Sequence, residues 1–346
     1  MRQIRIGERV VGPDQPCFII AEAGSNHDQK LSQAHKLVDL AADARADAVK
    51  FQSFVAPKIA ASTTHPIARI HFGGANSLYE LYEKMQLPRE WQAELSVHSR
   101  ERGIIFLSTP FDEEAVDELD ELGVPAFKIA SFELLHLPLL RHVAKKKKPV
   151  ILSTGMANLG DIEQAVNAIR GVGLEEIALL HCAINYPSKY ESVNLAAMDT
   201  MAQAFQVPIG YSDHTPGISV PIAAVARGAC IFEKHFTLNR QLPGADHSFA
   251  LEPDELKAMV AGIRQAEAAI GSPIKQAAAD EIEHLARGRR SLFASVDIPA
   301  GTVITREMVS ILRPGVGLAP SLLEMVVGRR TQHAIGRNEP ITWEKI

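Results

Sequence analysis

Short apolar runs alternate with longer amphipathic stretches along most of the chain. The runs contain few polar positions, which is typical of strands buried on both faces of a parallel sheet. They cover residues 17–24, 48–52, 104–110, 126–131, 149–155, 177–182, 207–210 and 230–232. Helical patterns cover residues 31–45, 89–102, 113–122, 137–146, 161–171, 195–205 and 217–228. This alternation predicts βαβ units, whose parallel strands end at the same edge of a sheet.

Eight such units within roughly 270 residues predict an α/β protein built on a (β/α)8 TIM barrel, here over residues 1–271. An open, doubly wound, dinucleotide-binding sheet is the alternative, but no G-x-G-x-x-G follows the first strand. Beyond the barrel, a polar, alanine-rich linker at 272–288 leads to a small β-rich domain at 289–346. A domain of this size buries a small fraction of its surface, so we expect it to be stabilised by packing against the barrel or against a second subunit.

Composition places the chain among ordinary globular proteins. Of its 346 residues, 46% are apolar and 22% are charged, and the net charge is −5. An acidic balance argues against a nucleic-acid partner. The three cysteines lie inside apolar runs and match neither a disulfide framework nor a zinc motif. Because the chain has no signal sequence and no apolar run of about eighteen residues, we expect a cytoplasmic protein without a membrane partner.

Two histidines follow the last two predicted strands. His214 comes after the run at 207–210, and His235 comes after the run at 230–232. Both strands should end at one edge of the sheet, so the two imidazoles are expected to face one cavity. Imidazole is a common neutral ligand of divalent transition metals, and two of them leave positions for water and a substrate oxygen. The alternative is that one or both histidines only form hydrogen bonds within a loop.

Two lysines lie inside predicted apolar strands. Lys50 and Lys128 are costly to bury without an anion, so each implies a negatively charged partner inside the ring. An internal carboxylate could serve, and those available are Glu22, Glu133 and Glu233. Short hydroxyl side chains stand at the same strand ends, namely Thr109, Ser131, Ser153 and Ser212. Two cations with several short donors suit a small ligand that carries both a phosphate and a carboxylate.

Several long motifs make the sequence similar to a known family. They are, in chain order, FIIAEAGSNH, ADAVKFQ, FLSTPFD, FKIASFE, VILSTGMA, YSDHTPGI, EKHFTLNR, PGADHSFALEPDE, GRRSLFASVDIPAG and RPGVGLAP. On these motifs the chain resembles the sialic acid (N-acetylneuraminate) synthases, transferases that condense phosphoenolpyruvate with the aldehyde of a 2-acetamido sugar to make nonulosonic acids. The resemblance spans nearly the whole chain, and residues 289–346 resemble the antifreeze-like, or SAF, domain of that family.

The resemblance implies roles for particular residues. His214 and His235 match metal ligands, most often for Mn2+ with Mg2+ or Co2+ as alternatives, and Glu22 matches the carboxylate beside the metal-bound water. The positions that match phosphoenolpyruvate contacts are Lys50, Thr109, Lys128, Ser131, Ser153 and Ser212, with Asn185 as a further candidate. Those expected to contact the sugar are Asn76, Glu133, Tyr186, Asp246 and Arg313. Arg313 matches an arginine that reaches the partner subunit's site, so the resemblance implies a domain-swapped homodimer.

Some positions differ from the family pattern. Ile184 stands where the sialic acid branch has an asparagine that contacts phosphoenolpyruvate, which leaves the role of Asn185 open. The FKIASFE motif is closer to the pseudaminic and legionaminic branches. The sugar implied by the resemblance is therefore N-acetylmannosamine or a close analogue, with a 2,4-diacetamido-trideoxyhexose as the alternative.

Two further alternatives concern the chemistry. A lysine on a barrel strand, here Lys128, can form a Schiff base with pyruvate instead of relying on a metal. A non-catalytic carbohydrate-binding or ice-binding protein, with the activity in the small domain, belongs to another class. The chemically functional residues at the strand ends favour an enzyme.

Overall fold

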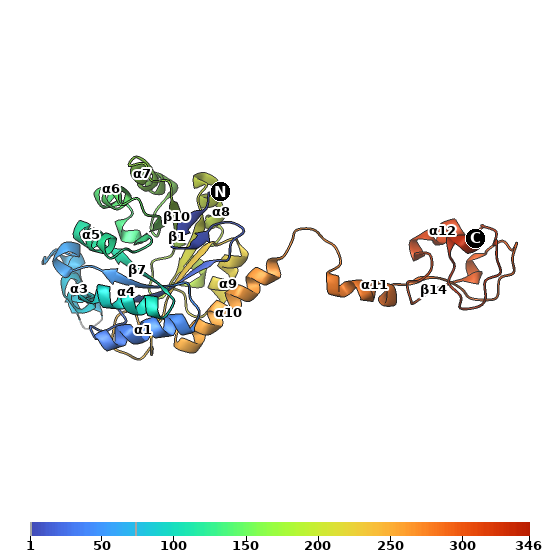
Figure 1. Cartoon of the computed structure of the whole chain (residues 1–346), viewed down its shortest axis with the longest axis horizontal. Coiled ribbons are helices and arrows are strands. Elements are labelled where there is room, and N and C mark those ends of the chain that lie inside the picture. Colours follow the sequence, from blue (N-terminus) through green and yellow to red (C-terminus); the bar gives the residue numbers. More distant parts are fainter. Residues whose placement is uncertain (1, 73–74) are drawn as a thin grey trace. The chain divides into compact units, whose positions relative to one another are not determined.

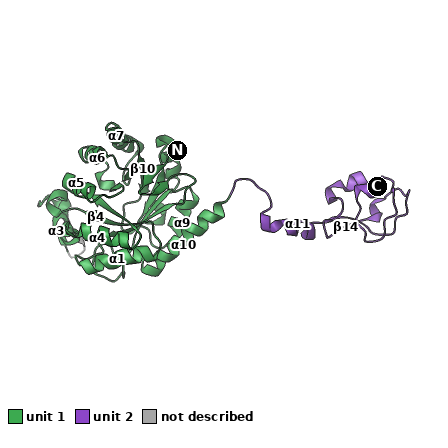
Figure 2. Ribbon diagram, in the orientation of Figure 1, with its two compact units in different colours: residues 1–271 green, residues 272–346 purple. Residues whose placement is uncertain are grey.

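The computed structural model describes residues 2–72 and 75–346, and the chain divides into two compact units, 1–271 and 272–346 (Figure 2). The first unit contains an eight-stranded parallel sheet in the order β7-β4-β3-β12-β11-β10-β9-β8. Its strands are β3 (Phe18–Gly24), β4 (Ala48–Ser53), β7 (Ile105–Pro110), β8 (Phe127–Ile129), β9 (Val150–Ser153), β10 (Ile177–Cys182), β11 (Ile209–Asp213) and β12 (Ile231–His235). The end strands β7 and β8 also pack against each other, which nearly closes the ring and confirms the predicted barrel.

Helices cover the outside of this ring (Figure 1). They are α1 (Leu31–Asp43), α4 (Trp91–Glu101), α5 (Glu113–Glu121), α6 (Leu137–Lys145), α7 (Leu159–Arg170), α8 (Ala197–Phe205), α9 (Ser219–Ala226) and α10 (Pro253–Ile270). Their apolar faces and the outward-facing strand residues form one large core. A capping box between Asn158 and Asp161 starts α7, since each side chain accepts a hydrogen bond from the other residue's amide.

A hairpin that the sequence pattern did not predict closes the amino-terminal end of the ring. Its strands, β1 (Ile4–Ile6) and β2 (Arg9–Val11), pair in antiparallel fashion. Ile4, Ile6 and Val11 are buried in one cluster with inward-facing strand residues such as Phe18 and Ile231. The floor of the barrel is therefore apolar, and polar inward-facing residues gather at the carboxyl ends of the strands.

A long excursion separates β4 from α4 on the side of the carboxyl strand ends. It contains α2 (Ala56–Ile59), β5 (Arg69–Phe72), β6 (Ala75–Ser77) and α3 (Leu78–Met85). The Ser77 hydroxyl caps α3 by accepting a hydrogen bond from the Glu80 amide at 3.2 Å.

The second unit has a core of its own. Its elements include η4 (Ala279–Glu281), α11 (Ile282–Gly288), β13 (Ser291–Ala294), β14 (Val309–Leu312) and α12 (Leu323–Val326), so the segment expected to be a linker contains a short helix. β13 and β14 are antiparallel, and apolar residues that include Leu292, Ile304 and Val326 pack between these elements. Among the described residues of both units, no helix is long and apolar enough to cross a membrane.

Candidate active site

Alternation along two neighbouring strands brings the two histidines to the same cavity. Successive side chains of a strand point to opposite faces, so residues two apart share a face. Ser212 and His214, at the end of β11, line the interior together with Glu233 and His235 of β12. The two imidazole centroids lie 5.3 Å apart.

The residues that precede the two histidines face outward and form a buried ion pair. Lys234 Nζ lies 2.5 Å from Asp213 Oδ2, and less than 2% of either side chain is exposed. Lys234 also donates a hydrogen bond to the Thr215 carbonyl at 2.6 Å. Asp213 in turn accepts hydrogen bonds from the Thr215 amide at 2.9 Å and from its hydroxyl at 3.1 Å. This pair ties the loop that carries His214 to the strand that carries His235.

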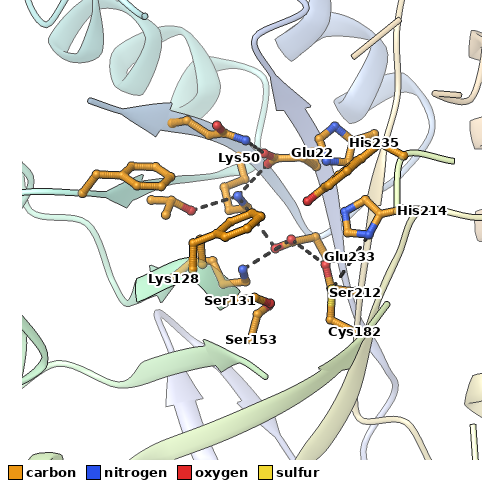
Figure 3. Close-up of a pocket in the computed structure, with 16 residues that line it drawn as sticks. Glu22, Lys50, Lys128, Ser131, Ser153, Cys182, Ser212, His214, Glu233 and His235 are labelled. Carbon is orange, nitrogen blue, oxygen red and sulfur yellow. Dashed lines mark hydrogen bonds and ion pairs between the residues drawn. The ribbon is translucent and has the colours of Figure 1, made fainter. Parts of the chain in front are cut away.

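The cavity at the carboxyl strand ends holds about 390 Å³ of empty space (Figure 3). Sequence-predicted residues that line it are Glu22, Lys50, Thr109, Lys128, Ser131, Ser153, Tyr186, Ser212, His214 and His235. They come from all eight strands or from the loops that directly follow them, as expected for a barrel.

A chain of alternating charges crosses the cavity (Figure 3). Lys50 Nζ lies 2.8 Å from Glu22 Oε2 and 3.9 Å from Glu233 Oε2, and it donates a hydrogen bond to Thr109 at 2.9 Å. Lys128 Nζ lies 3.4 Å from Glu233 Oε1. Internal carboxylates thus lie beside both lysines, as one of the two sequence interpretations required.

Burial and the neighbouring lysines give the carboxyl groups of Glu22 and Glu233 very different pKa values. Burial raises the pKa of Glu22 to about 7, against the opposing charge of Lys50. Burial also acts to raise the pKa of Glu233, but the ammonium groups of Lys128 and Lys50 outweigh it and hold this pKa at about 2. Glu233 is therefore the permanent anion, whereas Glu22 can exchange a proton near neutral pH.

The hydroxyl groups in the cavity differ in their partners. Ser212 donates a hydrogen bond to Glu233 at 3.1 Å, and Ser131 accepts one from the Gly155 amide at 2.9 Å. In the part of the chain that the structure describes, the buried Ser153 hydroxyl has no hydrogen-bond partner. A buried unsatisfied hydroxyl is costly, so Ser153 is suited to bind a ligand oxygen.

The donor set of the two histidines fits a divalent metal. Burial lowers the pKa of His214 to about 4 and also lowers that of His235, so both imidazoles are neutral at pH 7. His214 Nδ1 donates to the Ala183 carbonyl at 2.8 Å, which leaves its Nε2 lone pair free. Across residues 2–72 and 75–346, no cluster of three or more potential protein ligands occurs. A metal here would therefore take two histidines and complete its coordination with water or substrate.

Two of the predicted sugar contacts lie just outside this cavity. Asp246 accepts a hydrogen bond from the Ser25 hydroxyl at 3.0 Å, and its Oδ2 lies 3.8 Å from His235 Nδ1. Glu133 follows Ser131, and burial raises its pKa to about 7. The Tyr186 ring, in contrast, lines the cavity and packs at a tilt of 59° against the His214 ring, with 4.3 Å between ring centroids.

The other three predicted contacts are not brought to the cavity within the first unit. Asn76 and Asn185 are exposed, and neither is among the described residues that line it. The Ile184 side chain, one residue earlier, points toward Gly155 and the Ser131 side of the site. Arg313 belongs to the second unit, where its Nε donates to the Gly288 carbonyl at 2.6 Å.

Sequence reasoning did not assign several lining residues. Gln52 Nε2 donates to Glu22 Oε1 at 2.7 Å and so orients that carboxylate. Phe111, Phe132 and Cys182 complete the wall. Each lies at or directly after a strand end, and that position was the signal that could have identified them.

Comparison with known proteins agrees with this architecture. The NeuB family matches residues 37–275, and the SAF domain matches residues 289–346. The N,N'-diacetyllegionaminic acid synthase of Legionella pneumophila is 42% identical over 341 residues, which cover 97% of this chain and 96% of the relative. That of Campylobacter jejuni is 44% identical over 316 residues, which cover 90% and 95%.

A solved structure extends the likeness to three dimensions. The crystal structure of N-acetylneuraminic acid synthetase from Leptospira borgpetersenii, in complex with citrate, is 34% identical and has a TM-score of 0.74. The match covers 82% of this chain and 95% of that chain. The chain therefore belongs to the NeuB family and carries a SAF domain at residues 289–346.

Proposed function

We propose that the protein condenses phosphoenolpyruvate with the open-chain aldehyde of a 2-acetamido sugar. C3 of phosphoenolpyruvate attacks the aldehyde carbon, water adds at C2, and the adduct releases inorganic phosphate to leave a 2-keto-3-deoxy acid. The observation that carries this proposal is the cavity in which Lys50 and Lys128 lie beside Glu22 and two neutral histidines. N-acetylmannosamine and a 2,4-diacetamido-trideoxyhexose both have the aldehyde that this reaction needs.

The two lysines are proposed to bind the phosphate and carboxylate groups of phosphoenolpyruvate. Lys50 is held protonated, because Glu22 and Glu233 together outweigh the effect of burial and raise its pKa. The unsatisfied Ser153 hydroxyl supplies a neutral donor, and Thr109, Ser131 and Ser212 can turn toward the ligand from their present partners. Charge-assisted hydrogen bonds of this kind are the stronger class, which suits a multiply charged substrate.

Glu22 is proposed to activate the water that adds at C2. A pKa of about 7 lets a carboxyl group accept and return a proton at neutral pH, as general base catalysis requires. Hydrogen bonds from Gln52 and Lys50 hold its oxygens in one orientation. Bound at His214 and His235, a divalent metal, proposed to be Mn2+ with Mg2+ or Co2+ as alternatives, would supply Lewis acidity at the aldehyde oxygen.

The test is release of phosphate from phosphoenolpyruvate that requires both an aldehyde sugar and a divalent metal, with the product identified by mass spectrometry. His235→Ala should abolish this activity and leave the circular dichroism spectrum unchanged, because residues at a barrel mouth contribute little to the core. If His235→Ala keeps most of the metal-dependent rate, the assignment of the site is wrong. If no candidate sugar supports phosphate release, the non-catalytic binding alternative is favoured.

A Schiff base at Lys128 is a second candidate mechanism. Burial lowers the pKa of Lys128, and a neutral amine is the form that attacks a carbonyl. Sodium borohydride in the presence of pyruvate would trap such an adduct on Lys128. The metal mechanism predicts no adduct by mass spectrometry.

We also propose that the protein acts in the cytoplasm as a domain-swapped homodimer, in which Arg313 serves the partner subunit's site. The support is the sequence resemblance, together with three buried cysteines that are all unpaired. Arginine's planar fork suits the carbonyl and hydroxyl oxygens of a sugar.

A further inference from the structure

His247 is a fully buried histidine that is not among the residues lining the cavity. It lies between β12 and α10, one residue after Asp246. His247 Nε2 is 2.9 Å from Asp28 Oδ1, and its Nδ1 is 2.6 Å from the Thr237 hydroxyl. Because a carboxylate only accepts hydrogen bonds, Nε2 carries the hydrogen that faces Asp28. The three side chains of Asp28, His247 and Thr237, the His247 bridge, thus connect the loop after β3 with the segment that follows β12.

Both ends of the His247 bridge are attached to the framework of the barrel. At one end, Gln33 of α1 donates a hydrogen bond from Nε2 to Asp28 Oδ2 at 2.7 Å. At the other end, Thr237 comes two residues after the last residue of β12, and its amide donates to the Leu251 carbonyl at 2.9 Å. The bridge therefore runs from a helix of the outer layer to the end of a barrel strand.

The backbone comes very close to the bridge where Asp28 meets His247. A Cβ atom on Gly244 would lie 2.6 Å from His247 Cδ2 and 2.7 Å from Asp28 Oδ1, well below the roughly 3.5 Å of an ordinary non-bonded contact. Asp28 itself has a φ of 47°, in the left-handed region that is uncommon for residues other than glycine. Such strain persists only where the surrounding structure holds it, and it occurs often at functional sites.

The segment that the bridge holds carries the Asp246 carboxylate. Ser25, from the same loop as Asp28, donates to Asp246 Oδ2 from its hydroxyl at 3.0 Å and from its amide at 3.4 Å. The same oxygen lies 3.8 Å from His235 Nδ1. Asp246 can keep this position only while the two segments stay in register. Its neighbour His247 supplies the buried link that holds them there.

We propose that His247 is a positioning residue, which acts through Asp28 to hold the Asp246 carboxylate beside His235, where the acceptor sugar reacts. This inference rests on the proposed function and adds to it a residue that does not touch the substrate. The bond to Asp28 joins two separate segments, whereas the bond to Thr237 stays within one segment, so the first bond sets the position. A displacement of about 1 Å at a reacting group can lower a rate about a hundredfold.

Two substitutions of His247 separate the two bonds. A glutamine amide nitrogen stands near the place of Nε2 and can still donate to Asp28, whereas an asparagine is too short to reach Asp28 and can pair only with Thr237. His247→Asn should lower kcat/KM for the sugar about 10- to 100-fold and leave KM for phosphoenolpyruvate within about twofold of wild type. His247→Gln should keep most of the wild-type value. Gly244→Ala, which forces the pair apart without changing either partner, should resemble His247→Asn.

A second histidine–carboxylate pair provides the matched control. His98 Nε2 of α4 lies 2.9 Å from Asp39 Oδ1 of α1, so the chemistry is the same but the pair joins two outer helices. His98→Asn should leave kcat/KM for the sugar unchanged. Asp246→Asn tests the route of the effect: in that background His247→Asn should cause no further loss, because His247 acts through Asp246.

Hydrogen exchange of the full chain, followed by mass spectrometry, measures the positioning without turnover. Exchange in residues 25–30 and 237–250 should rise at least about tenfold in His247→Asn and stay near wild type in His247→Gln. Equal losses of sugar kcat/KM in the two variants, losses that add to that of Asp246→Asn, or unchanged exchange in His247→Asn would each refute the positioning role. If wild-type protein condenses neither N-acetylmannosamine nor its 2,4-diacetamido-trideoxy analogue but shows this exchange pattern, the His247 bridge stands and the proposed reaction fails.

Discussion

Replacing Lys234 by methionine should destabilise the barrel and loosen the histidine pair. Lys234→Met keeps the apolar part of the side chain and removes the ammonium group, which leaves the Asp213 carboxylate buried with only the two hydrogen bonds from Thr215. The Thr215 carbonyl also loses the hydrogen bond that it accepts from Lys234. Water cannot take the place of the ammonium group at the Asp213 carboxylate or at the Thr215 carbonyl without opening the packing between β11 and the helices.

The magnitude follows from the burial of the pair. Removing one partner of a fully buried ion pair costs about 3–5 kcal/mol, because the remaining charge is left without compensation. For a domain of this size that loss corresponds to a decrease in melting temperature of roughly 5–15 °C. Adding Asp213→Asn to Lys234→Met removes the uncompensated Asp213 carboxylate, so the double variant should regain most of the lost free energy of unfolding.

The measurements are thermal unfolding and the dependence of the rate on metal concentration. Lys234→Met should require a higher metal concentration for half-maximal rate, since the loop that carries His214 is less well fixed, with little change in KM for phosphoenolpyruvate. Arg227→Met is the matched control, because its partner Asp199 is about half exposed and such pairs contribute about 0–1 kcal/mol. A Lys234→Met protein that melts within about 2 °C of wild type and shows an unchanged metal dependence would refute the reasoning.

Three further predictions test the charges of the site and the second unit. Lys128→Met removes the ammonium group beside Glu233 and should raise KM for phosphoenolpyruvate at least about tenfold while KM for the sugar changes little; an unchanged value would indicate a purely internal ion pair. Burial raises the pKa of Glu22 from 4.5 to about 7, so its ionised form weakens the folded state progressively as pH rises through this window. Wild type should therefore lose stability between about pH 4.5 and pH 7, whereas Glu22→Gln, which has no carboxyl group to ionise there, should lose less over the same range; a loss as large in the variant by thermal unfolding would contradict this sign. Mixing Arg313→Ala chains with Glu22→Ala chains should restore roughly a quarter of the activity if the arginine serves the partner's site, and no recovery after proven subunit exchange excludes that arrangement.

The sequence predicted those parts of the molecule that follow from local patterns. Strands such as β3 and β12 are buried on both faces, so each could be recognised in the sequence as an apolar run with a chemically functional side chain near its carboxyl end. The rule that parallel strands end at one edge was sufficient to bring Lys50, Lys128 and both histidines to one cavity.

Other parts depend on contacts that a linear pattern does not encode. The three-residue strands of the β1–β2 hairpin are too short to show a period, and their burial depends on a ring formed much later in the chain. The apolar surface beside His235 is equally non-local, because Leu81 and Met85 of α3 line one cavity with Phe249 only in the folded barrel. The sharing of Glu233 between two lysines likewise depends on strand register and could not be read from the order of residues.

The hairpin at the floor of the barrel also constrains how the chain can fold as it is synthesised. Residues 2–11 are synthesised long before their partners: the Arg2 amide donates to the Gln206 carbonyl at 3.2 Å, and Ile231 belongs to the same buried cluster as Ile4, Ile6 and Val11. At synthesis rates of about 5–20 residues per second, residues 2–11 exist for on the order of ten seconds or more before these partners are made. During that interval Ile4, Ile6 and Val11 are exposed apolar side chains on a nascent chain. Closure of the ring and docking of the hairpin must therefore follow the synthesis of β12, whatever the order in which the outer helices form.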